Sequence, residues 1–156
     1  MSSRGPGVVM PPTLPFFAGF AAALWWNHSD PWLMQSGGDQ GLRLVAGTLI
    51  TAAGAALFWT GLWTFSRLRT GIMLQEPATR IVTTGPYRWS RNPQYVAFVA
   101  MYLGASILAN TLWPLVLLPL VIAALHWLVI EREEAYMHRT FRDEYRAYCQ
   151  RVHRWL

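Results

Sequence analysis

Lysine is absent from this sequence and cysteine occurs once, and each shortage excludes a kind of chemistry. All 13 basic residues are arginine, so no lysine is present to form a Schiff base. Cys149 is the single cysteine, so the chain forms no intramolecular disulfide and no metal site built from several cysteines.

Charged residues are few as well. They make up 13% of the 156 residues, whereas 53% are hydrophobic and nine are tryptophan. Apolar runs approach or exceed about 20 residues, the length that an α-helix needs to cross a bilayer. The composition predicts an all-α, multi-pass integral membrane protein with a single domain, residues 1–156. The net charge of +5 comes from arginines beside apolar runs, which indicates orientation in the lipid bilayer and not binding of nucleic acid.

Four apolar segments are predicted to span the membrane as a transmembrane helical bundle: residues 8–26, 42–65, 93–109 and 112–130. The first contains three prolines near its start, so we expect its first turns to be irregular or kinked. It ends in Trp25-Trp26 without a small-residue cleavage pattern, which favours a membrane span over a signal peptide. In the second segment, Gly47, Thr51 and Ala55 form a ridge of small side chains against which another helix packs closely.

Arginine is distributed unevenly among the connections. The 66–92 connection holds five arginines and the part after residue 130 holds six, whereas Arg43 is the single one beside the connection of the first two spans, and the 110–111 turn has none. By the positive-inside rule, both arginine-rich parts and both termini face the cytoplasm. The 66–92 connection and the acidic segment that begins at Glu131 should therefore meet at one cytoplasmic site.

The polar tail also has a helical pattern. Its apolar residues recur at intervals of four, four, three and four: Met137, Phe141, Tyr145, Tyr148 and Val152. This spacing puts them on one stripe of an amphipathic helix. We expect this cytoplasmic C-terminal helix to lie along the membrane interface or to cap the bundle.

The stretch 83–95, between two apolar runs, contains the strongest local signals. Gly85-Pro86 predicts a turn. Asn92-Pro93 predicts the start of a helix, because asparagine is a favoured N-cap and proline suits the first helical position. As a cap, Asn92 should be replaceable by aspartate.

Charged side chains flank this helix start and the end of the fourth span. The free N–H groups of the helix, together with Arg88 and Arg91, suit a carboxylate or a phosphate. Glu131, Glu133 and Glu134 follow the fourth span directly. Acidic groups at such depth are costly unless they are paired, so this cluster indicates a functional site. The alternatives are an ordinary capped loop and a solvated, salt-bridged helix face.

His126 precedes Glu133 by seven residues. At about 100° per residue, the two side chains lie within roughly 20° of the same face of an α-helix. His126 either supports Glu133 in the site or packs as a hydrogen-bonded histidine.

Several short motifs occur in the order found in a known family. They are Gly85-Pro86-Tyr87, Arg91-Asn92-Pro93-Gln94-Tyr95, a helical hairpin, Glu133-Glu134, the tail motif 141–148 and Arg154-Trp155. Together they make residues 79–156 resemble the membrane methyltransferases grouped with isoprenylcysteine carboxyl methyltransferase and phospholipid methyltransferases. Two positions depart from the family pattern. Asn92 stands where the family has histidine, and Arg142 stands where it has glycine, a change that we expect to matter little.

The resemblance implies that two segments, 79–95 and 126–155, bind S-adenosylmethionine. The expected catalytic residues are Arg91, Glu133 and Glu134. The expected cofactor-binding residues are Gly85, Tyr87, Arg88, Arg91, Asn92, Tyr95, His126, Glu133 and Glu134. An arginine beside a helix N-terminus suits the carboxylate of the cofactor, and a glutamate suits its ammonium or its ribose diol. Methyl transfer of this kind requires no metal and no nucleophilic side chain.

The methyl acceptor is expected to be small or lipophilic, because a site at the mouth of a membrane bundle is reached from the bilayer. A carboxyl group, an amine and a thiol are all open as the acceptor. Two other functions fit the same motifs. One is a non-catalytic membrane subunit or scaffold of the same fold. The other is an NADPH-dependent membrane reductase of the sterol reductase type, a class that shares the Arg-His-Pro-x-Tyr element but normally has more than four spans.

Overall fold

Helices make up the regular structure of the residues that the computed structural model describes, which are 10–34, 37, 39–68 and 80–156. These residues contain no strand and a single isolated bridge. In chain order the elements are α1 (Thr13–Ser29), α2 (Gln40–Leu68), the 3-10 turn η1 (Gly85–Arg88), α3 (Pro93–Leu108), α4 (Trp113–Leu125), the π-helical turn η2 (His126–Ile130) and α5 (Glu131–Arg151). The predicted all-α class is confirmed for this part of the chain.

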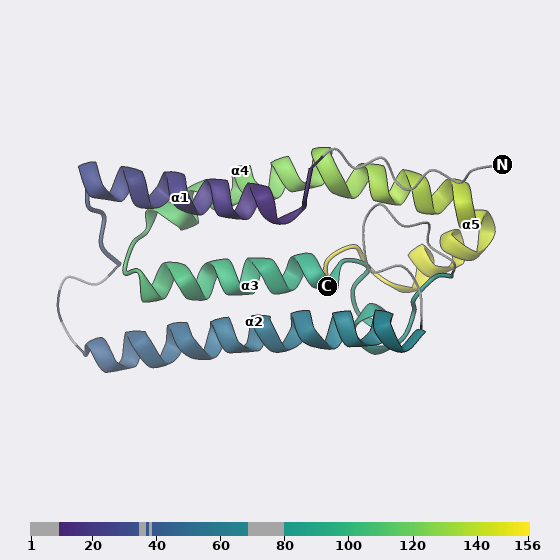
Figure 1. Cartoon of the computed structure of the whole chain (residues 1–156), viewed down its shortest axis with the longest axis horizontal. Coiled ribbons are helices and arrows are strands. Elements are labelled where there is room, and N and C mark those ends of the chain that lie inside the picture. The colour runs from purple at the N-terminus through teal and green to yellow at the C-terminus, as the bar shows by residue number, and fades with distance from the viewer. Residues whose placement is uncertain (1–9, 35–36, 38, 69–79) are drawn as a thin grey trace.

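Four of the helices run side by side along the long axis of the molecule (Figure 1). α2 packs along α3 and α1 packs along α4, with α3 lying between α2 and the α1–α4 pair. The start of α3 and the end of α4 lie near the middle of Figure 1, and α5 continues from the end of α4 toward the right of the picture. The two polar segments therefore meet at one end of the bundle, as the sequence predicted.

Two helices are long and apolar enough to cross a membrane by length and composition. They are Gln40–Arg67 and the helical stretch Trp113–Arg151, in which the apolar part ends at Ile130 and the polar part starts at Glu131. Pro93–Leu108 is a shorter apolar helix. Gln40–Arg67 covers the second predicted span, Pro93–Leu108 the third, and the apolar part of Trp113–Arg151 the fourth. The count of four spans stays a prediction.

α1 starts later than the first predicted span, whose residues 8 and 9 lie outside the described part of the chain. The helix begins at Thr13 with Pro12 in the N-cap position, and the backbone nitrogen of Leu14 donates to the carbonyl oxygen of Pro11 at 3.0 Å. Proline is tolerated at a helix start because the first N–H groups have no partner within the helix. Pro11 and Pro12 therefore precede α1 instead of kinking it.

The close contact of α2 and α3 depends on glycine. A Cβ atom added to Gly104 of α3 would lie 2.7 Å from the backbone nitrogen of Thr51 and 2.8 Å from the carbonyl oxygen of Gly47. Both distances are too short for a real Cβ atom, so the two backbones approach this closely because no side chain intervenes. The ridge of small residues predicted on the second span is confirmed at Gly47 and Thr51 as a packing face.

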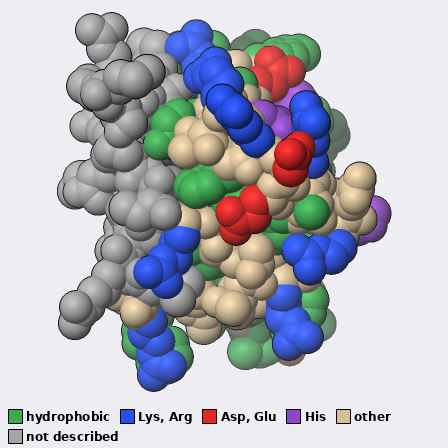
Figure 2. Space-filling view, turned by 90° about the vertical axis from the view of Figure 1, so that its right-hand side faces the viewer, with side chains coloured by type: hydrophobic (Ala, Val, Ile, Leu, Met, Phe, Trp, Pro, Cys, Tyr) green, Lys and Arg blue, Asp and Glu red, His purple; other side chains and the backbone are tan. Residues whose placement is uncertain are grey.

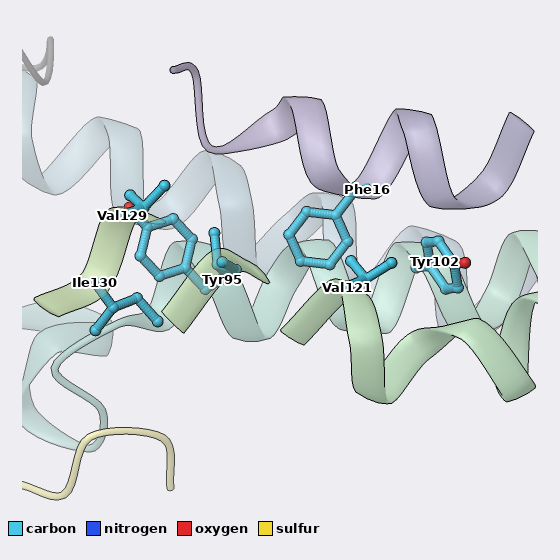
Figure 3. Packing of buried hydrophobic residues seen from close by; sticks show 7 residues of the cluster. Phe16, Tyr95, Tyr102, Val121, Val129 and Ile130 are labelled. Carbon is cyan, nitrogen blue, oxygen red and sulfur yellow. The ribbon is translucent and has the colours of Figure 1, made fainter. Parts of the chain in front are cut away.

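α1, α3, α4 and η2 meet in a cluster of buried apolar side chains (Figure 3). Phe16 of α1 packs edge-on against Tyr102 of α3, with ring centroids 6.1 Å apart, and Val121 of α4 belongs to the same cluster. Tyr95, in the first turn of α3, lies beside Val129 of η2 in Figure 3. The cluster therefore holds the start of α3 against the end of the fourth apolar segment.

The polar helix α5 packs on the end of the bundle through its apolar stripe. A second buried cluster contains Ile81, Tyr145, Tyr148 and Val152, with Met137, Phe141 and Cys149 packed against it. The predicted stripe is confirmed. It covers the connection that precedes α3, so α5 caps this end of the molecule.

α5 bends at Arg142, where φ is 42° and ψ is −110°. A side chain is strained in this region of backbone conformation, which glycine adopts freely. Arg142 stands where the family pattern that the chain resembles has glycine, and the expectation that this replacement matters little stays a prediction. The arginine holds a conformation that glycine would hold without strain.

Candidate functional site

The connection before α3 is fixed by a turn and by α5. η1 starts at Gly85, whose φ is 60°, as the predicted turn requires. A Cβ atom on Gly85 would lie 2.7 Å from Oγ1 of Thr64 on α2, so glycine also lets the turn approach α2. The Tyr148 hydroxyl donates to the carbonyl oxygen of Tyr87 at 2.7 Å. Burial raises the pKa of Tyr148 to about 12, so the hydroxyl keeps the proton that it donates.

Asn92 holds the N-cap position of α3, but its side chain does not cap the helix. Its backbone carbonyl oxygen accepts from the backbone nitrogens of Tyr95 at 3.0 Å and Val96 at 3.2 Å. Its side-chain Nδ2 donates instead to the carbonyl oxygen of Arg154 at 3.1 Å. The predicted side-chain cap is wrong, because a segment distant in the sequence takes the amide as its partner.

Glu134 is paired with two arginines. Its Oε1 lies 3.3 Å from Nη1 of Arg91 and accepts from Nε of Arg154 at 3.0 Å, and its Oε2 accepts from Nη2 of Arg154 at 2.6 Å. Such a two-point contact is among the strong charge-assisted hydrogen bonds. It raises the pKa of the Arg154 guanidinium above its ordinary value. Arg91 also donates to Sγ of Cys149 at 2.7 Å.

Glu133, the preceding residue, has a different environment. The Tyr95 hydroxyl lies 2.9 Å from both of its carboxylate oxygens, and no ion pair joins Glu133 to a cation of the described residues. Burial raises the pKa of the Glu133 carboxyl from 4.5 to about 7; the Tyr95 hydrogen bond opposes this shift and the charge of Glu134 adds to it. The carboxyl therefore titrates near neutral pH.

Two buried polar atoms at the start of α3 have no hydrogen-bond partner among the described residues. They are Nε of Arg91 and Oε1 of Gln94. Leaving a buried polar atom unpaired costs about 1–3 kcal/mol, so such atoms indicate a place for a ligand or water. One is a donor and the other an acceptor, which suits a ligand that carries both a negative group and an N–H or O–H group.

His126 and Arg88 lie apart from this arrangement. Nε2 of His126 is 3.5 Å from Oε1 of Glu131, and this is the ion pair that His126 forms with a described carboxylate. The predicted angle assumed an uninterrupted α-helix, whereas the π-helical turn η2 brings together residues five apart. Arg88 is exposed, with its guanidinium carbon 6.0 Å from the centre of the Trp89 ring, and forms no ion pair with a described carboxylate.

Arg154, Cys149 and Gln94 lie within the segments expected to bind the cofactor, but they were not among the individual site residues that the sequence predicted. Arg154 is 20 residues from its partner Glu134, and no regular spacing in the sequence relates the two. Gln94 lies between Pro93 and Tyr95, inside a predicted motif, but as the variable position of that motif it carried no signal.

Figure 2 views this end of the molecule. Arginine side chains lie around the face, acidic side chains lie among them, and hydrophobic side chains fill parts of the space between. The face therefore offers groups of both signs to a small ligand, beside an apolar surface.

An all-helical chain with two helices able to cross a membrane, and with paired arginine and glutamate side chains at one end, has the architecture of an integral membrane protein with a polar site. The family model for phospholipid methyltransferases matches residues 42–144, and the chain belongs to this family. The protein is therefore a membrane protein of a methyltransferase family, as the resemblance implied. No curated protein and no solved structure matches the chain.

Proposed function

We propose that the chain is an S-adenosylmethionine-dependent methyltransferase that binds its cofactor between the start of α3 and the first turn of α5. In a chain of this family, the main support for the proposal is the environment of Glu133. Glu133 has no cation partner among the described residues. It accepts a hydrogen bond from Tyr95 in the first turn of α3, and the residues around this helix start also include the unpaired atoms of Arg91 and Gln94.

The residues present fit the cofactor. S-adenosylmethionine carries a carboxylate, an ammonium, a ribose diol and a positively charged sulfur. Nε of Arg91, near the N-terminus of α3, suits the carboxylate. Glu133 suits a cationic group or the diol, and Oε1 of Gln94 suits an N–H or O–H donor. In this proposal Gly85, Tyr87 and Asn92 shape the site without contributing its charges.

The sulfonium of the bound cofactor supplies an activated methyl group for an in-line displacement. The part of this chain is to align donor and acceptor and to exclude water. When the acceptor is an amine or a thiol, its proton passes to the Glu133 carboxylate as the methyl group is transferred. A carboxyl that titrates near pH 7 is suited to this role, because a general base acts best when its pKa is near the working pH.

The acceptor in this proposal is lipophilic. The outer face of α2 exposes large apolar side chains, among them Leu49, Trp59 and Trp63, which suit contact with lipid. An acceptor dissolved in the bilayer reaches the end of the bundle along such a surface. The proposal includes four spans, both termini in the cytoplasm and a site that faces the cytoplasm.

Calorimetric titration of the detergent-solubilised protein tests the proposal. We expect binding of S-adenosylhomocysteine and no binding of NADPH. Replacement of Glu133 by glutamine should weaken the binding by about tenfold to a hundredfold, the effect of losing one charge-assisted hydrogen bond. Asp143→Asn, which removes an exposed carboxylate of the same helix, is the control and should bind as the wild type. Binding of NADPH alone would support a reductase, and binding of neither ligand would support a scaffold.

A further inference from the structure

Residues 152–155, which follow α5, lie against the connection that leads into α3. The backbone nitrogen of Arg91 donates to the carbonyl oxygen of His153 at 2.9 Å, within an isolated parallel bridge between Ser90 and His153. The carbonyl oxygen of Arg154 accepts from Oγ of Ser90 at 3.3 Å and from Nδ2 of Asn92 at 3.1 Å. We call residues 152–155 the closing segment. It lies outside the residues 42–144 that the family model matches.

The closing segment is anchored at both of its ends. Val152 is buried in the cluster that α5 forms with Ile81. Trp155 packs against the other buried cluster, which contains Tyr95. The Arg154 side chain between these anchors therefore reaches Glu134, and it stays 37% exposed.

Arg91, Arg154, Glu133 and Glu134 lie at this end of the bundle. Glu134 pairs with both arginines, whereas Glu133 pairs with neither. Arg154 contacts both oxygens of Glu134, and Arg91 contacts one of them. The side chain of Glu134 is only 13% exposed, so the pairing takes place with little water. Glu133 receives a hydrogen bond from an uncharged hydroxyl and no ion pair from the described residues.

We propose that Arg154 is a positioning residue that neutralises Glu134 and leaves Glu133 as the one carboxylate presented to the positive charge of the cofactor. This inference rests on the proposed function and adds a residue that controls ligand preference. S-adenosylmethionine carries a net charge of about +1 at neutral pH, because its sulfur is positive, whereas S-adenosylhomocysteine is close to neutral. The net charge of the site therefore sets the ratio of their affinities.

The test compares the dissociation constants of the two ligands in charge variants. In Arg154→Gln the site loses one positive charge, so the preference for S-adenosylmethionine over S-adenosylhomocysteine should rise by about tenfold. This factor corresponds to about 1.4 kcal/mol, the order of magnitude of one unit charge acting across a site at an effective dielectric constant of about 20. In Glu134→Gln the preference should fall by a similar factor. In the double variant Arg154→Gln, Glu134→Gln the ratio should return to that of the wild type. Arg154→Lys keeps the charge and should keep the ratio.

Arg151→Gln is the matched control. It removes the same charge from an exposed arginine whose Nε donates a hydrogen bond to the carbonyl oxygen of Ala147. It should leave the ratio of the two dissociation constants unchanged. Equal weakening of both ligands in Arg154→Gln would overturn the inference, because it would mean a purely structural role. If that variant does not fold, an unchanged ratio in Glu134→Gln would overturn it equally. Failure of the wild type to bind either ligand would instead refute the proposed function.

Discussion

Glu133 and Glu134 are adjacent and identical in type, and their surroundings give them different chemistry. Glu134 is held by two guanidinium groups. Glu133 accepts a hydrogen bond from the Tyr95 hydroxyl, and burial disfavours its charged form. A pair of carboxylates whose environments differ in this way commonly has separate roles in binding and proton transfer.

The pH dependence of ligand binding follows from Glu133. Its pKa is raised to about 7, so about a tenth of the carboxyl is ionised at pH 6 and about nine tenths at pH 8. The affinity for S-adenosylhomocysteine should therefore rise about tenfold between these pH values, as measured by calorimetry. Glu133→Gln should remove most of this dependence, whereas Glu131→Gln should retain it. A flat profile in the wild type would contradict the role given to Glu133.

The raised pKa of Glu133 also makes the free energy of unfolding depend on pH, and this dependence has the opposite sign to that of ligand binding. Because the folded-state pKa is higher than the ordinary value of 4.5, the folded protein binds more protons than the unfolded chain between about pH 4.5 and 7. The contribution of Glu133 to the free energy of unfolding therefore falls as the pH rises through this window.

Asn92 gives a second prediction at the scale of one residue. Its Nδ2 donates to the carbonyl oxygen of Arg154, so Asn92→Asp removes the donor and sets a carboxylate against a carbonyl oxygen. We expect this variant to lose about 1–3 kcal/mol of unfolding free energy, measured by denaturant titration. Asn92→His, the residue of the related family, keeps an N–H donor and should lose less. The reverse order would restore the interpretation of Asn92 as a helix cap.

At the scale of the element, helix α5 carries a strained residue. Arg142 has a φ of 42°, so Arg142→Gly should relieve backbone strain of about 1–3 kcal/mol and raise the midpoint of thermal unfolding. Arg139→Gly is the control. Arg139 is an exposed residue of the same helix, and glycine there should destabilise by about 1 kcal/mol. Destabilisation by both substitutions would mean that the bend at Arg142 is not strained.

The elements that the sequence predicted well are those with local signals. The start of α3 at Pro93 follows from the Asn-Pro pair, and the stripe of α5 follows from the spacing of Tyr145 and Tyr148, because both patterns depend on neighbouring residues. The π-helical turn at His126 could not be predicted, since it lies within an apolar run that has no break in its pattern. Likewise, the resemblance identified Arg142 as an unusual residue without giving its backbone angles.

The candidate site was predicted in part. The distribution of arginine predicted that the connection with Arg91 and the segment with Glu134 lie on the same side of the membrane. The 3.3 Å contact between these two side chains agrees with that expectation. The role of Arg154 could not be predicted. Its position depends on how Val152 and Trp155 pack against two different clusters, and such tertiary contacts leave no periodic pattern in the sequence.

For the whole molecule, the proposed topology makes a direct prediction. In a Cys149→Ser background, which keeps a hydrogen-bond acceptor for Arg91, we would introduce Gly37→Cys and Thr83→Cys separately. Both positions are exposed, and a side chain at Gly37 meets no atom within 4 Å. A membrane-impermeant maleimide applied to intact cells should label Gly37→Cys, and should label Thr83→Cys only after permeabilisation. The opposite pattern would reverse the orientation.

The distance along the chain between Glu134 and Arg154 has a consequence for synthesis. The ribosome makes Arg154 20 residues after Glu134, which takes about 1–4 s at about 5–20 residues per second. During that interval the chain contains Arg91 and both glutamates, and Arg154 has not yet been added. A nascent chain therefore acquires the charge balance of the finished site only when the closing segment is made, well after its membrane helices.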